Sequence, residues 1–298
     1  MIKRTLYFGN QAYLSLKDNQ LVIKKRDDEI VTAAIEDIAY IVLDSPQITV
    51  TNALLGALLE NNCAIINCDK THLPSGLLLP LAGNTLQSER FQAQIEASLP
   101  LKKQLWQQTV QQKILNQAAI LKKTRNAETG NMTAWASSVR SGDVDNREAV
   151  AAAYYWKELF PDIPDFVRDR NGVPPNNMLN YGYAILRGVV ARALVSSGLL
   201  PTFGIHHHNR YNAYCLADDV MEPYRPIVDK LVIDILAEIK EYPKDLSTDI
   251  KAKILQIPVL DCFINGERSP LMNAVATTTA SLAKCYMGVT KKLIYPEV

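Results

Sequence analysis

Short apolar runs that alternate with polar residues fill the first 80 positions of the chain. Turn-forming pairs such as Gly9-Asn10 separate these runs, and the pattern is typical of β-hairpins. Strands are therefore expected at the following ranges: 5–8, 13–16, 20–23, 30–32, 38–43 and 64–67. Residues 51–61 instead predict one short helix that is capped by Thr51 or Asn52.

From about residue 85 the apolar positions follow a helical period to the end of the chain. The clearest case is residues 220–239, where apolar side chains recur at spacings of three and four, although Pro223 and Pro226 disturb the first turns. Further helices are expected at these ranges: 85–98, 100–127, 144–159, 176–198, 247–256 and 269–290.

A Pro- and Gly-rich stretch at residues 74–83 separates the two patterns and predicts a linker. The fold class is therefore α+β, with a small N-terminal β-rich domain at residues 1–80 followed by a larger all-α domain at residues 81–298. The length of 298 residues is enough for a sizeable core in such an arrangement.

The composition indicates a folded protein of a reducing compartment. Hydrophobic residues make up 48% of the chain, so enough apolar surface can be buried to exclude general disorder. The five cysteines fit neither a disulfide framework nor paired zinc spacing. Neither a signal peptide nor an apolar run of about 18 residues is present. We expect a soluble, cytoplasmic protein.

The net charge of +1 gives no overall preference for nucleic acid. Any site for a polyanion must therefore be local, and residues 101–125 contain one basic stretch without an acidic residue. A solvated helix face explains the same stretch equally well.

Three consecutive histidines, His206, His207 and His208, precede a group of acids at Asp218, Asp219 and Glu222. On a helix, Asp218 and Glu222 would share one face. Carboxylates with one imidazole suit Mg²⁺ or Mn²⁺, and the imidazole favours Mn²⁺; zinc fits less well because no cysteine is suitably placed. The alternative is structural, with the acids stabilising a helix N-terminus.

Glu148 is a third acidic candidate, at the start of an Ala- and aromatic-rich segment. Together with Asp145 it resembles a capping box, and by pattern alone this explains Glu148 better than a metal-binding role does. Helix capping likewise accounts for Asn176. Tyr181 and Tyr183 are expected to pack in the core rather than to stack on DNA.

Three segments, residues 145–156, 168–183 and 204–226, together resemble the CRISPR-associated spacer integrases, in the branch that accompanies type II effector nucleases. The resemblance covers nearly the whole chain. It implies a metal site made of Glu148, of His207, which lies three residues after Gly204, and of Glu222.

The other candidates receive weaker assignments from the same resemblance. Asp219 is a weaker candidate ligand or a neighbour of the site. His206 and His208 would support the site, face DNA or be incidental.

The resemblance also implies an activity and partners. The activity is that of a Mg²⁺- or Mn²⁺-dependent DNA endonuclease and integrase, in which a 3′-hydroxyl of a short duplex attacks a phosphodiester at the edge of a CRISPR repeat. The partners would be double-stranded DNA, a second copy bound through the β-rich domain, and a small ferredoxin-like subunit that completes a heterohexamer. Other type II CRISPR proteins could join it. No membrane association is implied.

Phosphate contacts would hold the DNA irrespective of its sequence. The candidates are Lys102, Lys113, Lys122, Lys123, Arg125, Arg168, Arg170 and Arg210. For any one of them, an ordinary surface cation is an equally good explanation.

Two other functions remain open from the sequence. The first is a catalytically silent DNA-binding scaffold in which the acids only cap helices. The second is a metal-dependent phosphohydrolase that acts on small nucleotides. The sequence lacks a Gly-rich phosphate loop, which argues against this function.

Overall fold

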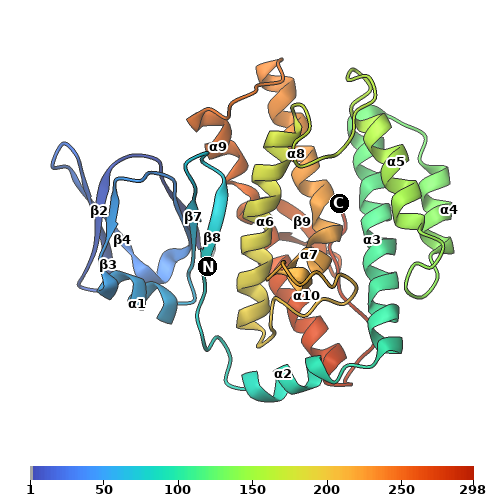
Figure 1. The fold of residues 1–298 in the computed structure, drawn as a ribbon, viewed down its shortest axis with the longest axis horizontal. Coiled ribbons are helices and arrows are strands. Elements are labelled where there is room, and N and C mark those ends of the chain that lie inside the picture. The colour runs from blue at the N-terminus through green and yellow to red at the C-terminus, as the bar shows by residue number, and fades with distance from the viewer. Residues whose placement is uncertain (1–2) are drawn as a thin grey trace.

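The computed structural model describes residues 3–298, with the N-terminal strands gathered on one side and most of the helices on the other (Figure 1). Two four-stranded sheets form the N-terminal part. The first has the order β1 (Arg4–Phe8), β5 (Ile38–Leu43), β7 (Ala64–Cys68), β8 (Pro74–Leu78). The second has the order β4 (Ile30–Ala34), β3 (Gln20–Lys25), β2 (Ala12–Lys17), β6 (Ile48–Val50).

The strand directions differ between the two sheets. In the first, β1, β5 and β7 are parallel and β8 runs antiparallel to β7. In the second, β2, β3 and β4 are antiparallel and β6 is parallel to β2. Helix α1 (Asn52–Glu60) follows β6, and the Thr51 side chain accepts a hydrogen bond from the Leu54 backbone, which confirms Thr51 as its cap.

The first sheet joins the two parts of the molecule because its two faces belong to different cores. Tyr40 and Ile66 pack with the helices, whereas Ile41 and Ile65 pack between the sheets. This alternation is the period of two expected of a strand. Helix α6 lies against β7 and β8 on the helical side.

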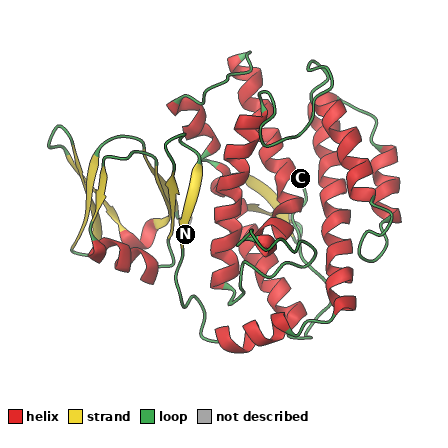
Figure 2. Ribbon diagram, viewed as in Figure 1, coloured by secondary structure: helices red, strands yellow, loops and turns green. Residues whose placement is uncertain are grey.

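Helices dominate the rest of the chain (Figure 2). They are α2 (Gln87–Ile95), α3 (Leu99–Arg125), α4 (Gly130–Ser138), α5 (Arg147–Leu159), α6 (Asn176–Ser196), α7 (Cys215–Met221), α8 (Arg225–Ile239), α9 (Thr248–Ile254) and α10 (Leu271–Tyr286). The short 3₁₀ turns are η1 (Ile35–Asp37), η2 (Glu222–Tyr224) and η3 (Ile257–Val259). None of the helices described is long and apolar enough to cross a bilayer.

The predicted α+β class is confirmed, and four details differ from expectation. The expected linker begins with β8, which extends the first sheet. A hairpin of β9 (Asp261–Ile264) and β10 (Glu267–Pro270) interrupts the region expected to be all helical. Strand β6 and helix α4 had no strong pattern in the sequence and were not predicted.

The fourth difference concerns the helix expected over residues 220–239. The chain forms α7, the 3₁₀ turn η2 and then α8, because Pro223 and Pro226 cannot donate the backbone hydrogen bonds of a continuous helix. Glu222 is the first residue of this 3₁₀ turn, and the break therefore determines where its carboxylate lies.

Candidate metal centre and cationic pocket

Glu148 lies in the first turn of α5, and another acid caps that helix. The Asp143 carboxylate accepts hydrogen bonds from the backbone N–H groups of Arg147, at 2.9 Å, and Glu148, at 3.0 Å. Asp145 instead pairs with Arg140. The capping-box interpretation of Asp145 and Glu148 is therefore wrong, and the Glu148 carboxylate points toward α3 instead.

The cation that meets Glu148 is Lys113 of α3. Its Nζ lies 2.6 Å from Glu148 Oε1 and 2.6 Å from Glu222 Oε2, so one ammonium joins two carboxylates from different elements. The Lys113 side chain is 12% exposed. Burial disfavours the charged amine, but the charges of Glu222 and Glu148 outweigh it and raise the pKa of Lys113. Lys113 was a candidate phosphate contact, and the structure places it between the two acids.

Glu222 is held from its other side by Arg225. The Nε of Arg225 donates to Glu222 Oε1 at 2.8 Å, whereas the buried Oε2 atom has no hydrogen-bond partner within residues 3–298. Lys113 Nζ approaches Oε2 closely but outside hydrogen-bond geometry. Burial opposes ionisation of Glu222, yet Arg225 and Lys113 lower its pKa to about 2. Glu222 is therefore an anion at neutral pH.

Asp219 shapes the histidine loop from the interior of the protein. Its buried carboxylate accepts hydrogen bonds from the backbone N–H of His206, at 2.8 Å, and of His207, and it binds the Nδ1 of His207. The hydrogen bond to Asp219 raises the pKa of His207 although partial burial opposes it. A Cβ on Gly204 would lie 2.8 Å from Asp219 Oδ2, so glycine permits this close approach.

The histidines differ in their surroundings. The ring of His206 stacks on Trp106 of α3 at 4.4 Å between centroids, and the ring of His207 meets the same indole edge-on at 5.4 Å. His208 is exposed. Because Nδ1 of His207 is engaged by Asp219, Nε2 is the nitrogen through which His207 can act as a ligand.

Asp218 belongs to a different cluster from Glu222, although the two residues are four apart. Arg187 of α6 binds the Asp218 carboxylate through two nitrogens, at 2.7 and 3.1 Å, and Asn212 donates to it as well. Asp218 thus ties α7 to α6 and does not meet the Lys113 ammonium.

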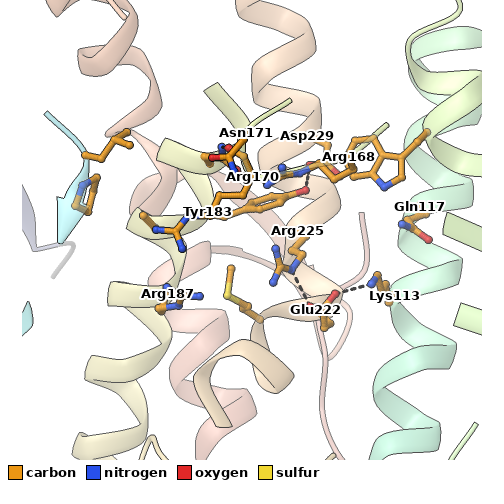
Figure 3. Close-up of a pocket in the computed structure, with 16 residues that line it drawn as sticks. Lys113, Gln117, Arg168, Arg170, Asn171, Tyr183, Arg187, Glu222, Arg225 and Asp229 are labelled. Carbon is orange, nitrogen blue, oxygen red and sulfur yellow. Dashed lines mark hydrogen bonds and ion pairs between the residues drawn. The ribbon is translucent and has the colours of Figure 1, made fainter. Parts of the chain in front are cut away.

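A pocket of about 610 Å³ opens beside Glu222 (Figure 3). Five basic side chains line it: Lys113, Arg168, Arg170, Arg187 and Arg225. Two acids, Glu222 and Asp229, also line it, so cationic groups outnumber anionic ones. A pocket of this composition suits a phosphate-bearing ligand.

Tyr183 organises two of the pocket arginines. The guanidinium carbons of Arg168 and Arg225 lie 5.0 and 4.4 Å from the centroid of the Tyr183 ring. The hydroxyls of Tyr183 and Tyr155 both donate to the buried carboxylate of Asp229. Burial raises the pKa of Asp229 to about 6. Arg225 lies in segment 204–226 of the resemblance but received no role from the sequence, and Asp229 lies outside the three segments.

The side chain of Asn176 binds the loop that precedes α6 and does not cap the helix. Its side chain accepts from Arg168 and from the Asp169 backbone, and donates to the carbonyls of Val167 and Val173. The helix-capping interpretation of Asn176 is therefore wrong, since no side chain among residues 3–298 forms a capping hydrogen bond at the start of α6. Tyr181 and Tyr183 are both buried, as predicted.

The remaining candidate phosphate contacts occupy varied positions. Lys122, Lys123 and Arg210 are exposed, and Arg210 stacks on the ring of Tyr211. Arg125 is half-buried and donates to the carbonyl of Leu159, whereas Lys102 is half-buried at the start of α3. These five do not line the pocket.

The donor set around Lys113 fits a divalent cation. Glu148 and Glu222 are directed at one positive charge, Glu222 Oε2 lacks a hydrogen bond, and carboxylate oxygens with an imidazole suit Mg²⁺ or Mn²⁺. Across residues 3–298, however, no three His, Cys, Asp or Glu side chains already stand in the arrangement of a metal site. The ammonium of Lys113 stands between the two carboxylates.

A known protein is similar to this chain over its whole length. The chain is 39% identical over 303 residues to the CRISPR-associated endonuclease Cas1 of Neisseria meningitidis serogroup C (strain 8013), an alignment that covers 100% of this chain and 97% of the relative. This similarity agrees with the type II-like branch expected from the motifs.

Solved structures show the same fold. A casposase bound to its integration product superposes with a TM-score of 0.80 at 20% identity and covers 98% of this chain and 92% of its own. A chain of a Cas6-RT-Cas1–Cas2 complex gives a TM-score of 0.76 at 19% identity, covering 99% of this chain and 36% of its own. Residues 6–265 match the family model described as CRISPR associated protein Cas1, and the chain therefore belongs to the Cas1 family of CRISPR-associated proteins.

Proposed function

We propose that this chain is a divalent-metal-dependent DNA integrase and endonuclease that inserts short DNA fragments into a CRISPR array as spacers. Glu148, His207 and Glu222 would hold the ion. The observation that carries the proposal is that two carboxylates from α5 and η2 converge on one positive charge at the edge of a cationic pocket. A role in capping alone does not explain Glu148, because Asp143 caps α5.

The reaction would be a transesterification. The 3′-oxygen of the incoming fragment forms a bond to phosphorus at the repeat edge, the bond from phosphorus to the 3′-oxygen of the array strand breaks, and the proton of the attacking hydroxyl passes through solvent to the departing oxygen. A bound Mg²⁺ or Mn²⁺ would lower the pKa of the attacking hydroxyl and offset charge on the phosphoryl group. With water as the attacking group, the same site would cut DNA.

The protein's own residues would orient the reactants. Asp219 holds the Nδ1 side of His207, so that Nε2 is directed away from it. Arg225 and Arg168, both stacked on Tyr183, present fixed guanidinium groups to phosphate oxygens. Arg170 lines the same pocket, and Lys122, Lys123 and Arg210 provide exposed positive charge for the duplex.

Two strands must be joined for one insertion, so one active site is not sufficient. We therefore propose that two copies act together, as a homodimer formed through the β-rich domain and bridged to a second dimer by a small ferredoxin-like subunit. The Cas6-RT-Cas1–Cas2 complex, which contains a chain of similar fold and joins Cas1 with Cas2, supports an assembly of this kind. The proposed place of action is the prokaryotic cytoplasm.

The test is strand transfer of a labelled short duplex into a repeat-containing plasmid in the presence of Mn²⁺. Glu148→Gln keeps the size of the side chain and removes its charge, and we expect it to lower the rate by about 100-fold or more. Glu158→Gln changes a half-buried acid of the same helix and serves as the matched control. Wild-type activity in Glu148→Gln would favour the alternative of a catalytically silent DNA-binding scaffold.

A further inference from the structure

The position of Lys113 raises a question that the proposed metal site does not answer. Its ammonium lies 2.6 Å from an oxygen of each of two carboxylates that are proposed to bind a divalent ion. Mg²⁺ and its analogues bind carboxylate oxygens at about 2.0–2.2 Å. A point that is close to both oxygens cannot hold the ammonium and the ion together, so their occupancy is mutually exclusive.

Of the two cations that contact Glu222, Lys113 is the one free to leave. Arg225 is fixed by its hydrogen bond to Glu222 Oε1 and by stacking on the Tyr183 ring. Lys113 has a flexible four-carbon stem, and its ammonium contacts only the two carboxylates among the residues described. It also lines the cationic pocket, so that a path away from the carboxylates exists.

A second observation shows where the ammonium could go. Gln117 lies one helical turn after Lys113 on α3 and lines the same pocket. Its side chain is 2% exposed, and within residues 3–298 its Oε1 atom has no hydrogen-bond partner. A buried acceptor without a donor is costly. Side chains four apart on a helix are neighbours, so a Lys113 ammonium turned toward the pocket could supply the missing donor.

We propose that Lys113 is an exchangeable internal cation: its ammonium holds Glu148 and Glu222 together until a divalent ion displaces it into the pocket, where Gln117 accepts it. The ammonium would then add to the positive charge that faces phosphate. The exchange lowers metal affinity, because binding must first remove a favourable ion pair. This inference rests on the proposed function, and Lys113 would be a positioning residue in it.

The first test is Mn²⁺ binding by isothermal titration calorimetry on the full chain. Lys113→Met removes the competing charge at similar side-chain length, and we expect Mn²⁺ to bind about tenfold more tightly or better. Lys113→Arg keeps the charge and is expected to bind Mn²⁺ no more tightly than the wild type. Lys103→Met, an exposed position on the same helix, is the control and should bind like the wild type.

The second test uses the unaltered protein and so does not depend on how the variants fold. Lysine acetylation footprinting with mass-spectrometric detection should show low labelling of Lys113 without Mn²⁺ and several-fold higher labelling with it. Lys103 should label equally in both conditions. In Glu148→Gln, Mn²⁺ should leave the labelling of Lys113 unchanged.

The role of Gln117 is tested by a double-mutant cycle. Gln117→Met should weaken Mn²⁺ binding in the wild-type background, and it should have no effect in the Lys113→Met background because no ammonium remains to be accepted. An equal effect in both backgrounds would overturn the part assigned to Gln117.

The outcomes separate this inference from the proposed function. If Mn²⁺ binding does not depend on Glu148 at all, the proposed metal site fails and the exchange fails with it. If binding depends on Glu148, but Lys113→Met binds no more tightly and the labelling of Lys113 stays constant, only the exchange is overturned.

Discussion

Asp143 and Asp145 lie two residues apart and have different functions at the start of α5. Asp143 caps the helix through the N–H groups of Arg147 and Glu148, whereas Asp145 forms an exposed pair with Arg140. Loss of a helix cap costs about 0.5–2 kcal/mol, and exposed ion pairs contribute about 0–1 kcal/mol. We therefore expect Asp143→Ala to lower the free energy of unfolding by about 1–2 kcal/mol in urea titrations and Asp145→Ala to lower it by less. The reverse order would restore Asp145 as the cap.

Asp229 gives a pH dependence at the same scale. Burial raises its pKa to about 6, above the value of the unfolded chain. The folded state thus binds a proton at Asp229 that the unfolded state has lost between about pH 4 and 6, and the contribution of Asp229 to stability falls as the pH rises through this window. Asp229→Asn should remove that fall, which is about 2 kcal/mol, when unfolding is compared at pH 4 and pH 7. Equal pH profiles of the wild type and the variant would show that Asp229 does not titrate in this range.

The types of the site residues could be predicted from the sequence, but their partners could not. The resemblance named Glu148, His207 and Glu222, and Glu148 and Glu222 now lie on either side of one cation. Lys113 is 35 residues from Glu148 and belongs to a basic stretch of α3, so its sequence context indicated a surface cation. The packing of α3 against α5 and η2 directs the Lys113 side chain into the protein.

Close contact between α6 and its neighbours determines the arrangement of the elements. Gly182 allows α6 to approach α8, since a Cβ there would lie 2.6 Å from Val228 Cγ1. Gly182→Ala should therefore destabilise the protein by about 1–3 kcal/mol. It should also reduce strand transfer, because α8 carries Arg225 at its first residue. A Cβ added to Gly56 of α1 would meet no atom of a neighbouring element within 4 Å among residues 3–298, and Gly56→Ala should stabilise the protein by about 0.5–1 kcal/mol in the same urea assay. Equal effects of the two substitutions would contradict the close α6–α8 contact.

Periodicity predicted the long helices better than the short elements. Helices α3 and α6 extend over many turns, so their patterns are unambiguous. The β9–β10 hairpin has four residues in each strand, which is too short to distinguish from a break between helices. A disturbance of the helix at Pro223 could be expected from the sequence. The direction in which the resulting 3₁₀ turn points the Glu222 carboxylate could not.

At the scale of the whole molecule, the buried ion pair between Asp44 and Lys251 connects the first sheet to the helices. Asp44, just after β5, accepts from Lys251 of α9 at 2.9 Å and also binds Tyr7 and His72. Burial opposes ionisation of Asp44, but these hydrogen bonds keep its pKa below the usual value. Lys251→Met would leave a buried carboxylate with fewer partners and should cost about 3 kcal/mol, measured by urea unfolding.

The double variant Asp44→Asn with Lys251→Met is the control for that prediction. Since both charges are then absent, it should recover part of the lost stability. A double variant less stable than the sum of the single changes would show that the pair does not act as a unit. Such a contact between residues 207 positions apart follows from the tertiary fold and leaves no local pattern in the sequence.

The most direct test of the metal centre is anomalous scattering from a crystal of the full chain soaked with Mn²⁺. We predict one strong peak bounded by carboxylate oxygens of Glu148 and Glu222 and by Nε2 of His207, at about 2.0–2.3 Å from its ligands. A peak elsewhere, or none while Glu148 and Glu222 remain joined by the Lys113 ammonium at saturating Mn²⁺, would contradict it.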